Sequence, residues 1–465
     1  MTSGEVTMEG RPAGRRPAWA WPLASLIVVA AAAPLVLHWL GNVDDQRLVD
    51  LDVYRTGGEM VLSGRPVYDF ITPAPQLLPF TYPPIAALLA MPLAVMSWPA
   101  AQWVWTAGIF VTLAITVGYG FRALLARADR PAAAPDGAAP DGAEAATGGP
   151  GAPGSGTGAA GRLRRVSRQV RMPVAFAFLT VMCTYLMPIR DQVRFGQVDI
   201  LLVALCLADC AARRPVWPRG MLIGLATAVK LTPGVFLIYL LVTGFGPGAR
   251  EEQRRTFFMA VFTATLLTLL PFLVIPADAA DFWFRALLDP ERLGANAATT
   301  NQSMRGMLIR LYMPDALTGL VWVALVAVVG WYGFRHARRA LLGGDGTTAV
   351  ALVGLMAVLL SPVAWIHHLA WAVVVLGAIA GDGRDPVRVR VAAGVWLYYV
   401  LPIPWWGVAI KAAEVPVVSP VLGKVVQNAF GLGALGLVWL LGVWLPRRRE
   451  AFREPGAGLP RAEVS

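Results

Sequence analysis

Long apolar stretches recur along the whole chain, and short basic or polar connections separate them. The stretches do not alternate strictly between apolar and polar positions, which argues against a membrane β-barrel. Because lipid offers the backbone no hydrogen-bond partner, segments that cross a membrane in this way must be helices. The pattern predicts an all-α polytopic membrane protein with about twelve spans, at residues 18–40, 100–123, 172–188, 198–212, 219–230, 232–243, 256–275, 316–334, 348–361, 363–380, 388–404 and 426–445.

The basic residues predict which side each connection lies on, because arginine-rich loops are retained in the cytoplasm. With twelve spans, every basic connection and both ends of the chain fall on the cytoplasmic side. This arrangement requires residues 219–243 to be two short helices that turn at Lys230. It also requires the proline-rich residues 80–97 to be a juxtamembrane or re-entrant helix. If residues 80–97 cross the membrane instead, the parity changes, so the number of spans stays open.

The same pattern divides the chain into five parts. They are a cytoplasmic tail (1–17), the first two spans with an outer loop and a juxtamembrane helix (18–123), a basic cytoplasmic linker (124–171), the remaining spans with their outer loops (172–445) and a second cytoplasmic tail (446–465). Residues 131–161 consist mainly of Pro, Ala and Gly, cannot bury a core, and are predicted to be flexible. The first apolar run is too long for a signal peptide and is expected to be retained as a span.

Composition agrees with this class, since 56% of the 465 residues are hydrophobic and only 15% are charged. The net charge of +11 comes from residues at helix ends and in short loops, not on one soluble face, so we expect no nucleic-acid partner. The three cysteines lie inside apolar segments and form neither a disulfide framework nor a zinc motif. No cofactor is expected.

The polar motifs that interrupt apolar sequence all fall on the predicted outer side. Ionisable groups at membrane depth are costly and usually mark a site or a pathway. The motifs are VDLDVYR (49–55), FTYPP (80–84), RDQVRFGQVD (190–199), VKLTP (229–233), TTNQSMRG (299–306) and SPVAWIHH (361–368).

Four cations in these motifs suggest a binding site for the phosphate of a lipid carrier. One of them is Lys230, which is one of only three lysines in the chain; the others are Arg190, Arg194 and Arg305. The lysine could instead extend to the membrane surface, and the arginines could be solvated loop charges. These two interpretations stay open at the level of the sequence.

His367 and His368 are half of the four histidines of the chain. Adjacent residues of an α-helix point about 100° apart, so we expect at most one of them to face a substrate directly. A merely packed histidine is equally compatible with the sequence. A metal site would need Asp50, Asp52 or another outer carboxylate nearby, which the spacing does not predict, so no metal is expected.

In their order along the chain, six motifs closely resemble the actinobacterial α-1,2-mannosyltransferases of glycosyltransferase family 87. The motifs are VDLDVYR, PFTYPPIAALLAMPL, FGQVDILL, GLATAVKLTP, TTNQSMRGMLIRL and LLSPVAWIHHLAW, and the resemblance runs from about residue 48 to residue 380. It implies a GT-C membrane fold and a polyprenyl-phosphate-mannose donor. It also implies a mannosylated lipid or lipoglycan acceptor and an active site on the outer face of the plasma membrane, among membrane lipids.

The resemblance also implies residue roles. Asp50 matches the family's proposed general base, whereas Asp52 falls on a variable position. His367 and His368 match a histidine pair and are expected to be catalytic, and Lys230 matches a lysine near the donor phosphate. Expected substrate-binding residues are Tyr54, Tyr82, Gln197, Asn301 and Gln302. Asp199 departs from the family, which often has asparagine there, and this leaves a neutral hydrogen-bonding role in doubt.

The implied chemistry needs only one carboxylate, because a polyprenyl phosphate leaves readily without being protonated. One base can deprotonate the acceptor hydroxyl while cations hold the departing phosphate. Glycosidases, by contrast, need a second carboxyl group to protonate a poor leaving group. A β-linked mannosyl donor then gives an α-linked product by inversion.

Three other functions were considered. A nucleotide-sugar enzyme could use Asp50 and Asp52 as a D-x-D metal grip, since alternate residues of an extended chain share a face. No soluble segment fits the nucleotide-binding domain that such enzymes need. A transporter or flippase of a lipid-linked sugar would explain charges at membrane depth, but no repeated halves are evident. A scaffold without activity would not explain the ordered polar motifs.

Overall fold

The computed structural model describes residues 17–43, 47–129, 158–289, 292 and 294–453, and in them confirms the predicted all-α class. Apart from helices and turns, these residues form only two isolated β-bridges. The helices are α1 (Ala20–Leu40), α2 (Val49–Leu62), α3 (Pro84–Ala94), α4 (Trp98–Gly120), α5 (Arg122–Asp129), α6 (Gly158–Thr184), α7 (Met187–Phe195), α8 (Asp199–Ala211), α9 (Met221–Val229), η2 (Thr232–Gly234), α10 (Val235–Gly244), α11 (Glu251–Val274), α12 (Pro276–Phe284), η3 (Ala286–Leu288), α13 (Met304–Ile309), α14 (Asp315–Leu342), α15 (Gly346–Leu359), η5 (Ile366–Trp371), α16 (Ala372–Ala380), α17 (Pro386–Val400), α18 (Ile403–Ala412), α19 (Val418–Gln427), α20 (Ala429–Trp439), η6 (Leu440–Trp444) and α21 (Leu445–Arg453).

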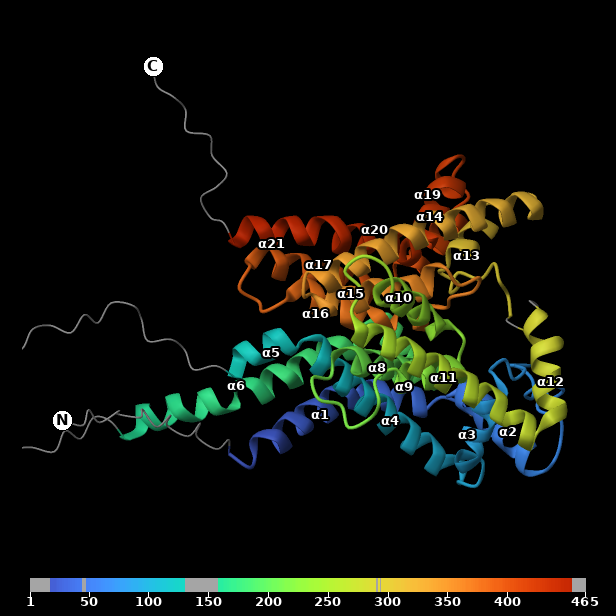
Figure 1. The fold of residues 1–465 in the computed structure, drawn as a ribbon, viewed down its shortest axis with the longest axis horizontal. Coiled ribbons are helices and arrows are strands. Elements are labelled where there is room, and N and C mark those ends of the chain that lie inside the picture. The colour runs from blue at the N-terminus through green and yellow to red at the C-terminus, as the bar shows by residue number, and fades with distance from the viewer. Residues whose placement is uncertain (1–16, 44–46, 130–157, 290–291, 293, 454–465) are drawn as a thin grey trace, which may run out of the picture.

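The long helices run along one axis of the molecule, and the two ends of that axis differ (Figure 1). The beginnings of α1 and α6, together with α5 and the end of α21, lie at one end. Helices α2, α3 and α12 lie at the other. The expected tails lie mostly outside the described residues, as does most of the expected linker.

The basic connections gather at the first of these ends. A cavity of about 940 Å³ brings three of them together, and its lining includes Arg122, Arg127, Arg213, Arg214 and Arg384. Two more are joined by a hydrogen bond from the guanidinium of Arg338 to the carbonyl of Pro247. This is the arrangement expected if these loops share one side of a membrane.

Helices α15 and α16 form the centre of the bundle. Every residue of α15 from Thr348 onwards is buried, and so is every residue of α16. A helix that is apolar all round is stable only where it is covered on all sides. By contrast, only 22% of the apolar windows of α1, α11 and α14 is buried. Their exposed apolar surfaces are suited to lipid.

The structure supports fewer complete spans than the sequence predicted. Five helices in the described residues are long and apolar enough to cross a membrane, or up to seven if two bent pairs each count as one span. The chain is therefore a multi-pass membrane protein, but twelve spans are not confirmed. The central helix α15 has 14 residues, about 21 Å, which is shorter than the roughly 30 Å hydrocarbon core.

Two predicted boundaries differ from the structure. The expected span 172–188 ends at Thr184, and α7 then continues at an angle of 75°, with Pro188 in its first turn. Proline is favoured there because the first turn needs no donor. At its other end α6 begins at Gly158, inside the expected linker, because RLRRVSRQVR consists largely of residues compatible with a helix.

Residues 80–97 contain α3, a helix of 11 residues, or about 17 Å. That length is too short to cross a membrane and agrees with the predicted juxtamembrane helix. The predicted turn near Lys230 is present, since α9 ends at Val229 and the next helical segment begins at Thr232.

Candidate active site

A glycine with a positive φ brings α2 against the segment that carries RDQVRFGQVD. Gly196 ends α7 with φ of 71°, and a Cβ atom there would lie 2.8 Å from Cβ of Leu51. The backbone N–H of Leu48 donates to the carbonyl of Arg194 at 3.2 Å. The indole N–H of Trp105 donates to the carbonyl of Gly196 at 2.7 Å. These contacts place the first turn of α2 beside the start of α8.

Asp50 lies in that first turn and is half-buried. Burial raises the pKa of its carboxyl group to about 7, although a hydrogen bond from Gln197 and the positive charge of Lys230 both lower the pKa. The negative charge of Asp199 adds a smaller upward shift of the pKa. A carboxyl group with this pKa can accept and release a proton near neutral pH.

Two tyrosines fix the orientation of Gln197. The hydroxyl groups of Tyr54 and Tyr82 lie 2.8 Å apart and share a hydrogen bond, and both lie within reach of Oε1 of Gln197, at 3.1 and 3.3 Å. Burial raises the pKa of Tyr82 to about 12, so this hydroxyl keeps its proton at neutral pH. Because the amide oxygen accepts from the tyrosines, the amide N–H groups are the donors available to Asp50.

Lys230 lies in the break after α9 and binds Asp199 at the start of α8. Its Nζ atom is 2.7 Å from Oδ1 of Asp199, and both side chains are almost fully buried, with exposed fractions of 13% and 8%. The same ammonium group lies 5.3 Å from the centre of the Tyr82 ring. Lys230 therefore connects the Asp199 cluster with the tyrosine pair beside Asp50.

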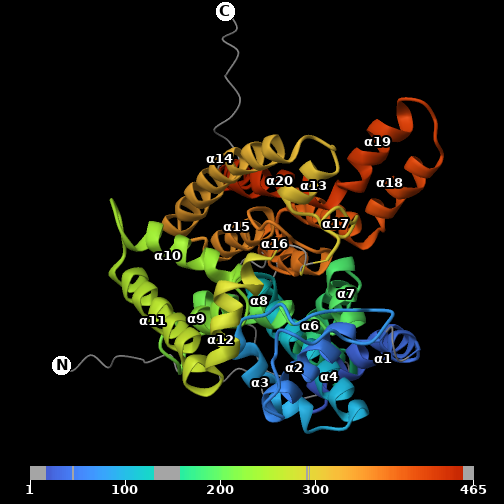
Figure 2. The same cartoon turned by 90° about the vertical axis from the view of Figure 1, so that its right-hand side faces the viewer.

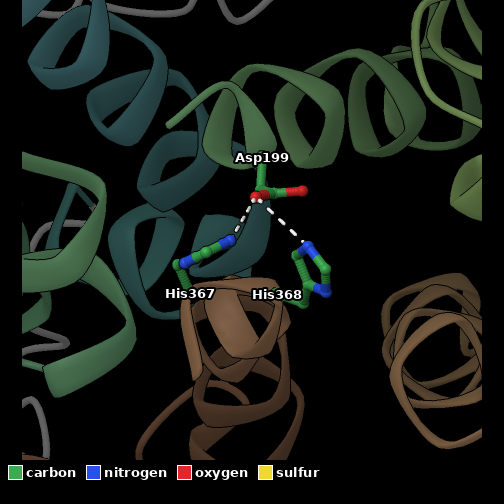
Figure 3. Close-up of side chains that lie close together, drawn as sticks. All are labelled: Asp199, His367 and His368. Atoms are coloured by element: carbon green, nitrogen blue, oxygen red, sulfur yellow. Dashed lines mark ion pairs between the residues drawn. The ribbon is translucent and has the colours of Figure 1, made fainter. Parts of the chain in front are cut away.

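His367 and His368 lie side by side next to the carboxylate of Asp199 (Figure 3). Their Nε2 atoms lie 3.7 and 3.8 Å from Oδ2 of Asp199. Gln192 positions this turn by donating to the carbonyl of His367 at 2.8 Å. We expected the rings to diverge as on an α-helix, but they belong to the 3₁₀-helix η5 and both face the same carboxylate.

The hydrogen bonds of His368 indicate its tautomer. The backbone N–H of Trp365 donates to Nδ1 at 3.1 Å, so a neutral ring carries its proton on Nε2. That nitrogen lies 3.0 Å from Nζ of Lys230, so two donors face the same space. An anionic oxygen bound between them would accept both hydrogen bonds.

A metal ion is possible on distance alone, because ligand atoms of Asp199, His367 and His368 all lie within 4.8 Å of one another. Two observations favour an anion instead. Binding of a metal through Nε2 of His368 would require the other tautomer, and the adjacent ammonium group of Lys230 would repel a cation.

The expected arginines occupy different surroundings from Lys230. Arg194 is exposed, and its guanidinium stacks over the rings of Trp39 and Phe195 at 4.9 and 4.8 Å. Arg190 and Arg305 are half-buried, and no contact joins them to the Asp199 cluster among the described residues. A role for these arginines at the donor phosphate remains a prediction.

Asn301 and Gln302 are fully buried, and their amides hold the loop itself. Asn301 accepts from the backbone N–H groups of Ser303 and Ala364 at 3.2 and 3.1 Å. Gln302 donates to the carbonyls of Thr299 and Gln427 and accepts from the N–H of Gly431. These side chains hold the loop against the 361–368 segment, and their expected role in contacting substrate remains a prediction.

The D-x-D interpretation of Asp50 and Asp52 assumed an extended chain, and this assumption is wrong. Both residues lie in α2, where alternate positions point about 200° apart. They therefore cannot grip one ion from the same face of a strand.

Two residues with clear structural roles were missed. Asp199 was noted only as a departure, although a carboxylate inside an apolar run is itself a signal for a buried partner. Arg310 was not considered. It is 2% exposed and donates to Asn428, Ala298 and Asn301 at 2.6–2.7 Å.

Comparison with known proteins gives consistent matches. The model of glycosyltransferase family 87 matches residues 80–362. A polyprenol-phosphate-mannose-dependent alpha-(1-2)-phosphatidylinositol mannoside mannosyltransferase of Mycolicibacterium smegmatis is 33% identical over 84% of this chain and 84% of its own length. The protein of the same description from Mycobacterium tuberculosis is 33% identical over 87% of this chain and 86% of its own length.

A more distant relative is the corresponding pentamannoside mannosyltransferase of M. smegmatis, which is 28% identical over 82% of this chain and 81% of its own. Among solved structures, ArnT from Cupriavidus metallidurans bound to undecaprenyl phosphate covers 94% of this chain and 80% of its own. Its TM-score is 0.36 and its identity is 16%, too low to support an argument. The family match spans more than half of the chain, and two relatives are 33% identical to it over more than four fifths of its length, so the chain belongs to glycosyltransferase family 87.

Proposed function

We propose that this protein transfers mannose from polyprenyl-phosphate-mannose to a mannosylated lipid and forms an α-1,2 linkage with inversion. The observation that carries the proposal is the similarity, over more than four fifths of the chain, to two enzymes described as using this donor on phosphatidylinositol mannosides. It favours a phosphatidylinositol mannoside over a larger lipoglycan as the acceptor. The geometry around Asp50 and Lys230 supplies the groups that the reaction needs.

Asp50 is the proposed general base. It takes the proton of the acceptor hydroxyl as that oxygen bonds to C1 of mannose. The amide of Gln197, held by Tyr54 and Tyr82, donates to the carboxylate and fixes its direction. Because these groups are buried around it, the carboxylate is held in place before the acceptor binds.

Lys230 and His368 are the proposed donors to the leaving group. The bond from C1 to the phosphate oxygen breaks, and its electron pair stays on the polyprenyl phosphate. Nζ of Lys230 and Nε2 of His368 lie 3.0 Å apart, so the two N–H groups can donate to one phosphate oxygen. Asp199 holds the lysine, and His367 lies against the free oxygen of Asp199.

We place this site at the outer face of the plasma membrane. The support is that the basic connections gather around the cavity at one end of the molecule, which is then cytoplasmic. Helices α2 and α3, which lead to the site, lie at the opposite end (Figure 1). Lipid-linked donor and acceptor can both reach a site at that surface from within the bilayer.

The test uses the purified full-length protein in proteoliposomes with radiolabelled polyprenyl-phosphate-mannose and a phosphatidylinositol mannoside. We expect a labelled product whose new bond an exo-α-1,2-mannosidase cleaves. Transfer from GDP-mannose alone, in a preparation that cannot make the donor lipid, would contradict the proposal.

Asp50→Asn should lower kcat by about 100-fold or more while donor-lipid binding persists, because general bases typically contribute factors of this size. Asp52→Asn is the matched control, since it removes a carboxylate two residues away on another face of the same helix. Equal loss in both variants would argue against Asp50 as the base.

A further inference from the structure

Helices α18 and α19 form a hairpin that projects sideways from the bundle. In the view along the long axis, the two helices stand clear of the rest of the molecule (Figure 2). In the perpendicular view, they lie in the half of the long axis that carries α2 and α13 (Figure 1). The sequence pattern had predicted only a connecting loop between the spans 388–404 and 426–445.

The hairpin exposes apolar side chains on both helices. On α18 the exposed fractions are 38% for Trp405, 47% for Trp406 and 40% for Val408. On α19 they are 60% for Val421, 47% for Leu422 and 52% for Val425. Apolar surface of this extent in an element away from the core usually marks contact with a partner or a membrane.

Neither helix is long enough by itself to cross a bilayer, because each has 10 residues and is about 15 Å long. Helix α18 is joined to α17 through a bend of 50°, so it departs from the direction of α17. Two of the three lysines of the chain, Lys411 and Lys424, lie on the hairpin. Tryptophans and lysines beside apolar residues are typical of elements that lie at the membrane surface.

Glycines at the contact between α18 and α19 make the hairpin a compact unit. A Cβ atom on Gly407 would collide with the backbone of Gln427, and one on Gly423 would collide with Lys411. At the tip, the backbone N–H of Val415 donates to the hydroxyl of Ser419 at 2.8 Å. The hairpin therefore has a defined shape before it meets anything else.

The base of the hairpin is connected to the polar loop near the candidate active site. Lys411 donates to Oε1 of Gln427 at 3.2 Å, and Nε2 of Gln427 donates to the hydroxyl of Thr299 at 2.7 Å. The amide of Gln302 donates to the carbonyl of Gln427 at 3.0 Å. A displacement of the hairpin would therefore move the 299–303 loop.

We infer that the α18–α19 hairpin lies in the headgroup region of the bilayer, with its exposed apolar side chains among the acyl chains. It thereby holds the 299–303 loop at the depth where lipid-linked molecules arrive. The first part of this inference is independent of the proposed reaction, because it concerns only contact with lipid.

Nitroxide spin labels test the contact in proteoliposomes of phosphatidylcholine and phosphatidylglycerol. The full-length protein, with its three native cysteines replaced by alanine, carries one label at Val421→Cys or Trp406→Cys. Val328→Cys on the spanning helix α14 is the lipid reference, and Val216→Cys, which is 97% exposed between α8 and α9, is the aqueous reference. Retained transferase activity shows that each labelled protein is folded.

We expect the labels at Val421 and Trp406 to be relaxed by oxygen more than by a water-soluble nickel chelate, as at Val328. Nickel accessibility equal to that at Val216 would overturn the inference. Low accessibility to both reagents would also overturn it, because a protein partner or a second copy would then cover the hairpin. Spin–spin broadening at full labelling would identify the second copy.

The connection to the 299–303 loop has its own test. Val421→Asp places a charge on the lipid-facing side, away from the contact with α18. We expect it to raise the KM for the lipid acceptor about fivefold or more with little change in kcat, by moving the loop. An unchanged KM in a protein whose hairpin label has moved into water would overturn the coupling, and leaves the proposed reaction itself unaffected.

Discussion

The polar segments 190–199 and 299–306 both interrupt apolar sequence near the candidate site, but their side chains have different kinds of hydrogen-bond partner. In the first segment, Gln197 and Asp199 extend toward groups in other parts of the chain, namely Tyr54, Tyr82 and Lys230. In the second, the amides of Asn301 and Gln302 bond mainly to backbone groups of their own loop and its neighbours.

The two segments also differ in whether their buried polar atoms have hydrogen-bond partners. Around the first segment, Oδ2 of Asp199 and Nε2 of His367 are buried without a hydrogen-bond partner among the described residues. Native structures pair nearly all such atoms, so unpaired ones need an explanation, and a missing ligand is one. In the second segment the side-chain atoms of Asn301 and Gln302 are paired. The first segment is therefore suited to chemistry, and the second to holding shape.

The largest expected effect is on stability and concerns the second segment. Arg310→Met removes three hydrogen bonds from a buried guanidinium to Asn428, Ala298 and Asn301. Each acceptor left unpaired costs roughly 1–3 kcal/mol, so we expect a loss of about 3 kcal/mol or more. Thermal unfolding in detergent, followed by loss of the monodisperse peak, measures it.

Arg305→Met is the matched control, because Arg305 lies in α13, five residues before Arg310, and is half-buried. We expect it to keep the thermal stability of the parent protein. If both variants were equally unstable, the contrast between a structural arginine and a surface-facing one would fail.

The next effect is on catalysis and concerns the first segment. Lys230→Gln should lower kcat by about 10²–10³, the usual effect of removing one donor to a developing negative charge. Transfer from the labelled donor lipid measures it. Because the lone carboxylate of Asp199 could itself disturb the site, the double variant Lys230→Gln with Asp199→Asn is also needed.

The double variant lacks both charges of the Lys230–Asp199 pair, so recovery of full activity there would mean that Lys230 only neutralises Asp199. We expect it to stay impaired. Arg194→Gln tests the exposed cation of the same segment, and we expect less than a threefold effect because its guanidinium stacks on aromatic rings.

The sequence predicted the positions of helices better than the directions of individual side chains. Apolar stretches located the helices, since they are a local property of the sequence, and the sidedness of the basic connections located the break at Lys230. The direction in which a polar side chain points depends on helix register, which Gly196 resets with a positive φ. For this reason the roles of Gln192 and Gln197, five residues apart, could not be separated from the sequence.

Long-range pairing was equally hidden. Asp199 meets Lys230 across 31 positions, and Arg310 meets Asn428 across 118. No local pattern in the sequence predicts which residues pair over such separations. The family often has asparagine at the position of Asp199, so the resemblance did not predict an ion pair there. The twelve predicted spans are not confirmed, because continuous apolar sequence also predicts burial, and burial inside the bundle, as in α15, does not require a helix that crosses the membrane.

A smaller effect concerns pH. With the pKa of Asp50 raised to about 7, the carboxylate is the active form, so kcat/KM should be constant above this value and fall about tenfold per pH unit well below it. Initial rates between pH 5 and 9 at low acceptor concentration measure the profile. Asp52→Asn should keep the same acidic limb, and a limb near pH 4 in the parent protein would contradict the assignment.

The smallest effects separate the neighbours of Asp50. The hydrogen bond from Gln197 lowers the pKa of Asp50, so Gln197→Leu should move the acidic limb to higher pH. The charge of Asp199 raises that pKa, so Asp199→Asn should move the limb to lower pH. Opposite shifts, each a fraction of a unit up to about one unit, require both residues to face the same carboxylate. Gln302→Leu, in the structural segment, should lower stability without moving the limb. A shift there would mean that the two polar segments are not distinct in function.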